Sequence, residues 1–351
     1  MHTDTVFLIT TDATSRLEAI LDHALDGVQV RSVSLEDLAQ GQLQGGRLLF
    51  ALGVDDLGMG PETLGLLRCL RQYPGALTGC TAVVLADGCG ELYTKQAAQA
   101  LVLAANLSGC LFPGKPLVEG TGSLYNQHIL AAQRGLSLGE TYFARSRELV
   151  RRLLDFEAPK FTRPRILMLH ASDNRRSNTV AMGSRVLEHL APHCDLKTIS
   201  LQNGAIYDCR GCSYKACLHY SQSGTCYYGG ALPTEVFPAI LNADAVLLLC
   251  PNYNDAPSAN IMALINRMTG LLLRKPLFDK YLYCIVVSGY SGGDLVARQI
   301  LGALCLNKTM VLPPDFCFFQ TANDPGTAMA VPDMEQRLRS WSSQILKSLT
   351  P

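Results

Sequence analysis

The sequence predicts an α/β protein of two tandem doubly wound domains, each with a five-stranded parallel sheet. Short apolar runs of strand length alternate with longer segments of helical period along the chain. The order of elements in the first half recurs in the second, where residues 77–92 align with residues 278–295. Alternating βα units of this length form a parallel sheet with helices on both faces.

The first half contains the first copy of this plan. Its apolar runs predict five strands, at residues 6–9, 28–33, 48–52, 81–85 and 109–112. Helical spacing predicts helices over 16–25, from about 61, over 94–107 and over 145–156. Two prolines punctuate the segment that follows. We therefore expect a first domain at 1–157, a linker at 158–164 and a second domain at 165–351.

The second half repeats the plan with one addition. Its strands are predicted at residues 166–169, 195–200, 245–250, 282–288 and 310–312, and helices over 180–190 and 261–272. A cysteine-rich segment at residues 202–230 has no counterpart in the first copy. We expect this segment to form a cap on the second domain.

Residues 170–179 are a polar stretch between a predicted strand and a predicted helix. Unpaired N–H groups in a helix's first turn favour an anion at this place. Hydroxyl, amide and guanidinium groups add further donors, which indicates a phosphate cradle, although the same residue types also form ordinary helix caps. The matching loop of the first copy, residues 10–15, has no arginine. We expect that copy to have lost its cofactor site.

Two further loops follow strands of the second copy, at residues 250–260 and 288–294. Both are expected at the same sheet edge as the cradle, where open parallel sheets bind ligands. Tyr253 offers a flat face to an aromatic ring, and the glycines of the second loop permit close backbone approach. The three loops together predict a site for a phosphate at one end and a planar group at the other.

Residues of about 164–348 resemble the flavodoxin-like NAD(P)H-dependent FMN reductase family, which grades into iron–sulfur flavoproteins. Residues 171–179 are similar to the family's Gly-Ser-Pro-Arg-x-x-Ser-Asn-Thr motif, with one extra residue. Residues 250–267 are similar to its Ser-Pro-x-Tyr…Ile-Asp-Arg run, with Cys250 in place of serine and Asn266 in place of aspartate. Residues 288–293 resemble its glycine loop.

The resemblance implies that both domains are flavodoxin-like, with the strand order 2-1-3-4-5. It also implies FMN as cofactor and NAD(P)H as co-substrate. It implies that the phosphate is held by Ser172, Arg175, Ser177, Asn178 and Thr179. It implies that the ring lies against Pro251, Asn252, Tyr253 and Asn254, with Ser288, Gly289, Tyr290 and Gly292 along its pyrimidine edge. No catalytic acid–base pair is expected, because a flavin supplies the redox chemistry.

The implied activity is hydride transfer from NAD(P)H to flavin N5, followed by electron transfer to a small-molecule acceptor such as a quinone, a nitro compound or a flavin. One alternative is an electron-transfer protein, with or without an iron–sulfur cluster, that serves a protein partner. Another is a flavin-binding module without turnover.

Four of the thirteen cysteines fall within eighteen residues of the cap: Cys209, Cys212, Cys217 and Cys226. Four thiolates could hold a [4Fe–4S] cluster or a tetrahedral zinc ion. The spacing is longer than in the iron–sulfur members that the chain resembles, so free thiols or a redox pair remain the alternatives.

Composition limits the partners. The 30 basic and 30 acidic residues balance, so the sequence predicts no nucleic-acid binding. Apolar runs are too short to span a membrane, no signal peptide is visible and the odd cysteine count favours free thiols, which predicts a cytoplasmic protein. The resemblance implies dimerisation near FMN, so we expect a homodimer or a pseudo-dimeric monomer. In the latter, the first copy replaces a second subunit; alternatively, it is a docking module.

Overall fold

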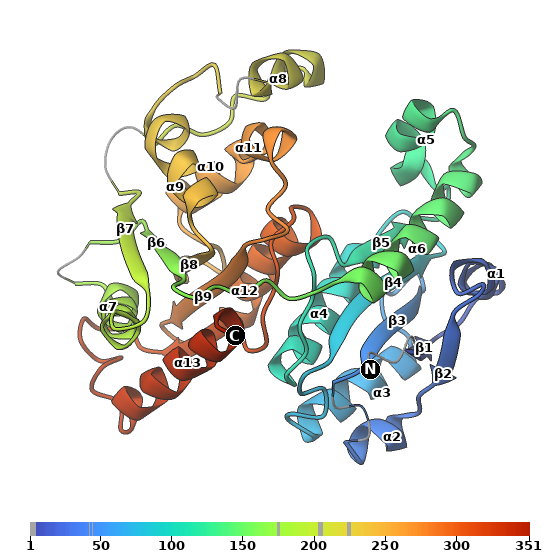
Figure 1. The fold of residues 1–351 in the computed structure, drawn as a ribbon, viewed down its shortest axis with the longest axis horizontal. Helices are drawn as coiled ribbons and strands as arrows, with labels where there is room; N and C mark the ends of the chain where they lie inside the picture. Colours follow the sequence, from blue (N-terminus) through green and yellow to red (C-terminus); the bar gives the residue numbers. More distant parts are fainter. Residues whose placement is uncertain (1–4, 42, 44, 174–175, 203–205, 223–225) are drawn as a thin grey trace. The chain divides into compact units, whose positions relative to one another are not determined.

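The computed structural model describes residues 5–41, 43, 45–173, 176–202, 206–222 and 226–351. The chain divides into two compact units, Met1–Ala158 and Pro159–Pro351 (Figure 1). Each unit contains one five-stranded parallel sheet. Within the described residues, every helix is too short or too polar to span a bilayer.

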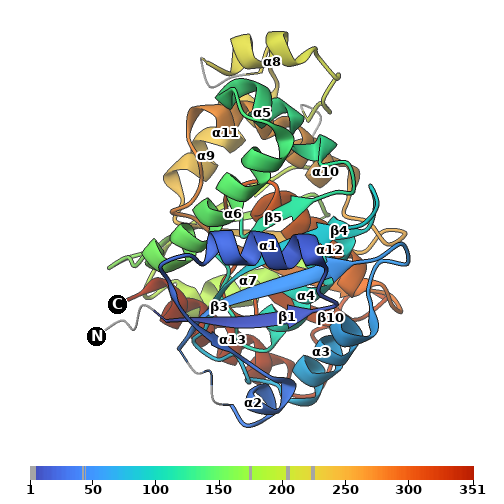
Figure 2. The same cartoon turned by 90° about the vertical axis from the view of Figure 1, so that its right-hand side faces the viewer.

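Unit 1 alternates strands and helices. Its strands are β1 (Thr5–Thr11), β2 (Gln29–Ser32), β3 (Arg47–Val54), β4 (Thr81–Gly88) and β5 (Leu117–Gly120). Its helices are α1 (Ser15–Ala24), α2 (Leu35–Ala39), α3 (Pro61–Gln72), α4 (Thr94–Leu107), a 3-10 turn (Tyr125–Gln127), α5 (His128–Arg134) and α6 (Leu138–Asp155). The sheet order is β2-β1-β3-β4-β5. Figure 2 shows α1 and α6 on one face of the sheet and α2 and α3 on the other.

Unit 2 follows the same plan with the cap inserted. Its strands are β6 (Arg165–His170), β7 (Asp195–Ser200), β8 (Ala245–Pro251), β9 (Tyr281–Ser288) and β10 (Cys317–Thr321). Its α-helices are α7 (Asn178–Leu190), α8 (Tyr214–Ser221), α9 (Phe237–Asn242), α10 (Ala259–Arg267), α11 (Thr269–Arg274), α12 (Gly293–Leu301) and α13 (Met334–Leu349). Two π-helical turns cover Leu232–Val236 and Gly302–Leu306.

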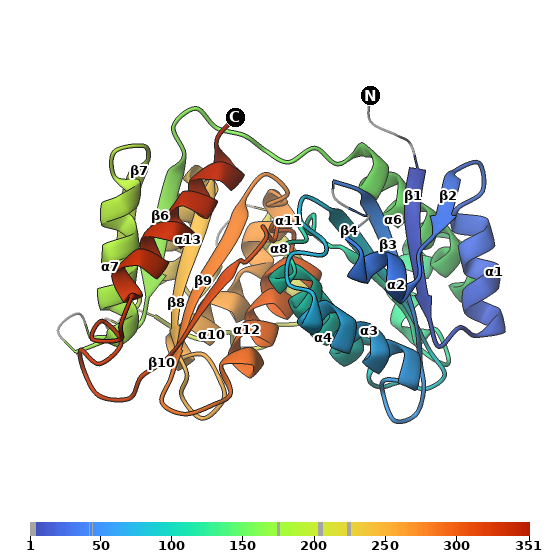
Figure 3. The same ribbon diagram turned by 90° about the horizontal axis from the view of Figure 1, so that it is seen from below.

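The sheet order of unit 2 is β10-β9-β8-β6-β7, which is the order 2-1-3-4-5 counted along the unit. Helices α7 and α13 pack together on one face, while α10 and α12 lie on the other (Figure 3). Strands β8 and β9 are buried along almost their whole length, as central strands covered on both faces should be. The predicted fold class is confirmed in both units.

The fifth strand was predicted at the wrong place in both units. Residues 109–112 and 310–312 provide only isolated bridges, Thr81 to Leu111 and Tyr281 to Val311. The fifth strands β5 and β10 lie a few residues further on. Prolines follow both predicted runs and prevent the strand from continuing there.

The two units share a backbone detail at this turn. Lys115 has φ 52° and Asp315 has φ 50°, so each unit places a non-glycine residue in the left-handed region just before its fifth strand. The repeated left-handed residue extends the internal repeat from sequence to backbone conformation.

Candidate functional site

Three loops of unit 2 meet at one sheet edge. Strand β6 ends at His170, β8 at Pro251 and β9 at Ser288, and these strands are parallel neighbours. The carboxyl ends of parallel neighbours lie together, so the residues that follow them share one edge. The structure therefore brings the phosphate-cradle loop and the two loops expected to flank a ring to the same place.

The loop after β6 has unused hydrogen-bonding capacity. Ser172 is 5% exposed, and its buried Oγ has no partner. Ser177 caps α7 by accepting from the Val180 N–H at 3.3 Å, and its Oγ lies 2.7 Å from Thr179 Oγ1. The N–H groups of Asn178 and Thr179 have no partner among the described residues. Arg175 lies outside the described residues.

His170 supports this loop from below. Its ring Nδ1 lies 3.1 Å from the carbonyl oxygen of Ser172 and donates to it. Burial lowers the pKa of His170, against the smaller raising effect of that hydrogen bond. Burial therefore favours the neutral form of His170.

The Asn178 side chain binds a distant loop, a role that the sequence did not indicate. Its Nδ2 donates to the Asp324 carbonyl at 2.9 Å, and its Oδ1 accepts from the N–H groups of Gly326 at 2.9 Å and Ala328 at 3.4 Å. The side chain thus fastens the loop at 324–328 to the start of α7. This loop uses the Oδ1 and one Nδ2 hydrogen of Asn178.

The loop after β8 is a tight two-residue turn. The Tyr253 N–H donates to Ala256 O at 3.0 Å, and the Ala256 N–H donates back to Tyr253 O at 3.2 Å. Asn254 and Asp255 between them have φ 53° and 61°, the left-handed conformation that Asn and Asp adopt most readily among non-glycine residues. The turn leaves the Tyr253 side chain exposed beside half-buried Pro251.

Asn252 ties this turn to the glycine loop after β9. Its Nδ2 lies 2.9 Å from Ser291 O, 3.3 Å from Ser288 Oγ and 3.3 Å from Asp255 Oδ1. Its Oδ1 is buried and has no partner. Asn252 therefore fixes the two loops against each other and leaves one acceptor unused.

Close packing leaves no room for a side chain at Gly292, in the loop after β9. A Cβ at Gly292, whose φ is 80°, would lie 1.9 Å from Asp255 Oδ1. Tyr290 in the same loop is 85% exposed. A groove of about 370 Å³ lies between this loop and the end of β10, with Ser288, Tyr290 and Phe319 among its lining residues.

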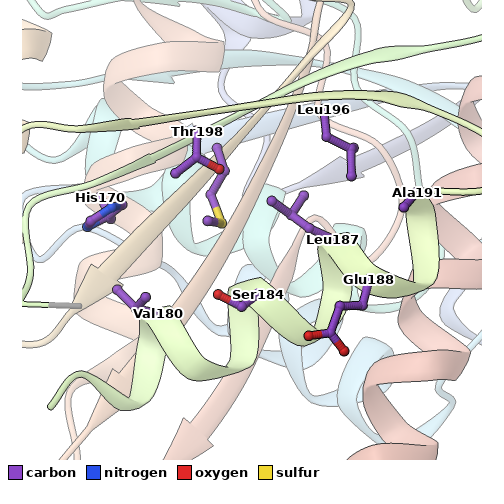
Figure 4. A pocket seen from close by; sticks show the side chains of 9 residues that line it. His170, Val180, Ser184, Leu187, Glu188, Ala191, Leu196 and Thr198 are labelled. Atoms are coloured by element: carbon purple, nitrogen blue, oxygen red, sulfur yellow. The ribbon is translucent and has the colours of Figure 1, made fainter. Parts of the chain in front are cut away.

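A larger open groove, of about 550 Å³, lies between α7 and strands β6 and β7. Figure 4 shows it running along α7 from His170 and Val180 to Leu196 and Ala191. It lies along the face of the sheet rather than at its carboxyl edge, and apart from His170 it shares no residue with the three loops.

The four cap cysteines line one small pocket of about 100 Å³. Arg267, at the end of α10, anchors the cap by donating to Tyr207 O at 3.2 Å and Gly229 O at 2.8 Å. Within the described part of the chain, no three His, Cys, Asp or Glu side chains are placed so as to hold a metal ion. The structure gives the predicted [4Fe–4S] cluster or zinc ion no support.

The corresponding edge of unit 1 is filled by its own side chains. Arg16 forms an ion pair with buried Asp87 at 2.9 Å, and its Nη1 and Nη2 donate to the carbonyl groups of Gly88, Thr121 and Gly122. The Asp12 carboxylate accepts from the first turn of α3, including the Thr63 N–H at 3.0 Å.

The two units differ in where their buried polar atoms without a hydrogen-bond partner lie. Among the described residues, the buried side-chain nitrogen and oxygen atoms without a partner all belong to unit 2. Three of them lie in its edge loops: Ser172 Oγ, Asn252 Oδ1 and Ser258 Oγ. Sequence reasoning missed Ser258 and Asp255 as site residues, although the Asn-Asp pair was a visible turn signal.

Residues 164–324 match the model of a family described as NADPH-dependent FMN reductase. No curated protein sequence is significantly similar to the chain. Among solved structures, an apo NADH:FMN oxidoreductase (EMOB) is 17% identical, with 53% of this chain and 90% of that chain covered and a TM-score of 0.38.

Two further structures show similar distant likeness. An NAD(P)H:quinone oxidoreductase from Methanothermobacter marburgensis is 14% identical, with 52% and 97% covered and a TM-score of 0.40. An FMN-dependent NADH-azoreductase from Bacillus anthracis, in complex with FMN, is 11% identical, with 52% and 99% covered and a TM-score of 0.35. At such low scores, assignment rests on the family match and on the residues themselves.

Proposed function

We propose, from the premise that residues 164–324 belong to the NADPH-dependent FMN reductase family, that the three loops of unit 2 bind FMN and that the protein uses this FMN to reduce small molecules. The observation that carries the proposal is the buried Oγ of Ser172, which has no partner among the described residues and lies in the loop between β6 and α7. A buried hydroxyl without a partner costs about 1–3 kcal/mol, so such a group is expected where a ligand supplies the missing bond.

The donor set suits a phosphate monoester. The Ser177 and Thr179 hydroxyl groups and the backbone N–H groups of Asn178 and Thr179 lie at the positive end of the α7 dipole, and Ser172 in the preceding loop adds a buried hydroxyl. We assign the phosphate to these groups and to Arg175. The Asn178 side chain is left out because its Oδ1 and one Nδ2 hydrogen already bind the loop at 324–328.

The other two loops suit a planar ring with polar edges. Pro251, Asn252, Tyr253 and Asn254 would support the ring, and Ser288, Gly289, Tyr290 and Gly292 would lie along its edge. The unused Oδ1 of Asn252 can accept from a ring N–H, and Asn252 Nδ2 keeps the loops at a fixed separation.

FMN held by these loops would supply the chemistry of hydride acceptance and electron transfer. This chain's residues bind and orient, and no acid–base pair is needed. The exposed rings of Tyr253, in the loop after β8, and Tyr290, in the loop after β9, suit a flat, aromatic acceptor. We therefore propose a quinone, a nitro compound or a second flavin as acceptor, with NADPH or NADH as donor.

Unit 1 is proposed to carry no flavin. Arg16 and Asp12 already use the groups that a phosphate would need there, so binding would have to break an ion pair with a buried carboxylate. The chain is expected to bind one FMN. A second function, electron transfer through an iron–sulfur cluster, gains no observation in its favour.

Two variants, each lacking the side chain that caps the N-terminus of a helix, test the proposal. Ser177→Ala and Thr14→Ala each remove the hydroxyl that caps the first helix of one unit, where Thr14 Oγ1 accepts from Leu17 N–H at 3.1 Å. Each should lose about 1 kcal/mol of stability. FMN fluorescence titration should show affinity falling about 10- to 100-fold in Ser177→Ala alone. Equal affinities in both variants, or no bleaching of bound FMN by NADPH or NADH, would contradict the proposal.

A further inference from the structure

Asp255 places a carboxylate where the loop after β8 meets the loop after β9. Its Oδ1 lies 3.3 Å from Asn252 Nδ2, and the same nitrogen contacts Ser288 Oγ and Ser291 O. The Oδ1 also lies so close to Gly292 that no side chain fits there. The carboxylate is therefore inside the group of residues assigned to the flavin ring.

The backbone that carries this carboxylate is fixed from two sides. The left-handed φ of 61° at Asp255 and the two hydrogen bonds between Tyr253 and Ala256 define the turn. The Gln299 side chain of α12 donates to the Asp255 carbonyl oxygen at 2.9 Å. The backbone of Asp255 is thus held by both neighbouring elements, while its side chain is exposed.

The charge of Asp255 is not balanced by a cation. Among the described residues, no Lys, Arg or His forms an ion pair with it, whereas Asp294 at the start of α12 pairs with Arg298 at 2.9 Å. Two carboxylates therefore lie near the glycine loop, and only Asp294 is neutralised by a partner. In the described part of the chain, the Asp255 carboxylate contacts the neutral amide of Asn252.

Resting on the proposed function, we propose that Asp255 lowers the reduction potential of the bound flavin and makes the protein a stronger reductant. Reduction adds negative charge to the ring, and a fixed carboxylate beside the ring opposes that charge. At a separation of about 10 Å and an effective dielectric constant of about 20, such repulsion changes an equilibrium by about tenfold. The expected substrates are therefore electron acceptors of low reduction potential. Flavoproteins that are weaker reductants would leave such acceptors oxidised.

The test measures the midpoint potential of FMN bound to the unaltered protein, to Asp255→Asn and to the control Asp294→Asn. Asparagine tolerates the left-handed turn, so Asp255→Asn changes charge with little strain. The ratio of reduced to oxidised flavin at fixed poise should rise about tenfold in Asp255→Asn, equivalent to about 30 mV for a two-electron couple. Asp294→Asn should change it much less, and high salt should shrink the Asp255 effect.

The outcomes separate this inference from the proposed function. An unchanged potential in Asp255→Asn with FMN bound would overturn the inference alone. Loss of FMN by both Asp255→Asn and Asp255→Gly would overturn it as well, since Asp255 would then hold the cofactor rather than tune it. Failure of the unaltered protein to bind FMN would overturn the proposed function, and the inference with it.

Discussion

Replacement of Ser172 by alanine should have opposite effects on the free and the FMN-bound protein. In the free protein the buried Oγ has no partner, so its removal relieves a desolvation cost. Such a cost is about 1–3 kcal/mol, and we expect the free energy of unfolding to rise by up to about 1 kcal/mol, because the vacated volume is small.

In the complex, Ser172→Ala removes a hydrogen bond to a charged phosphate. Bonds of that kind contribute about 1.5–3 kcal/mol, so FMN should bind about 10- to 100-fold more weakly. The assay is urea unfolding of the free protein, combined with FMN fluorescence titration of the same preparation. A variant that is clearly destabilised without FMN, yet binds FMN as tightly as the unaltered protein, would refute the reasoning.

Three further predictions concern other parts of the chain. Arg16→Met should leave buried Asp87 unpaired and destabilise unit 1 by about 3 kcal/mol in urea unfolding, with FMN affinity unchanged. His170 has a lowered pKa in the folded state, so its contribution to stability is present above the unfolded value of about 6.5 and is lost as pH falls below it. Between pH 6.5 and 5, the free energy of unfolding should fall less in His170→Gln than in the unaltered protein, as measured by urea unfolding curves. Gly292→Ala should weaken FMN binding and destabilise by about 2 kcal/mol or more, whereas Gly326→Ala, at φ 84° with open space around it, should cost only about 1 kcal/mol; equal losses in these two variants would contradict the contact with Asp255.

Elements with a clear period were predictable from the sequence. Residues 94–107 and 195–200 are helix α4 and strand β7 with the predicted bounds. Helix α6 begins seven residues before the predicted start at 145, although Ser137 and Glu140 form a capping box that the sequence displays. The fifth strands were misplaced because a short apolar run before proline has the same pattern as a strand.

The site could be predicted only in part. Parallel topology is enough to bring the three loops to one edge, because it depends on element order alone. The bond between Asn178 and the loop at 324–328 joins residues almost 150 positions apart, and no local pattern encodes it. Asp255 became a site residue only once the left-handed turn had placed its carboxylate beside Asn252.

A crystal structure of the chain with bound FMN tests the central claim most directly. We expect one FMN per chain, with a phosphate oxygen within about 3.0 Å of Ser172 Oγ and the ring between the loops of Tyr253 and Tyr290. FMN bound elsewhere in unit 2, or at the edge of unit 1 in place of the Arg16–Asp87 ion pair, would contradict it.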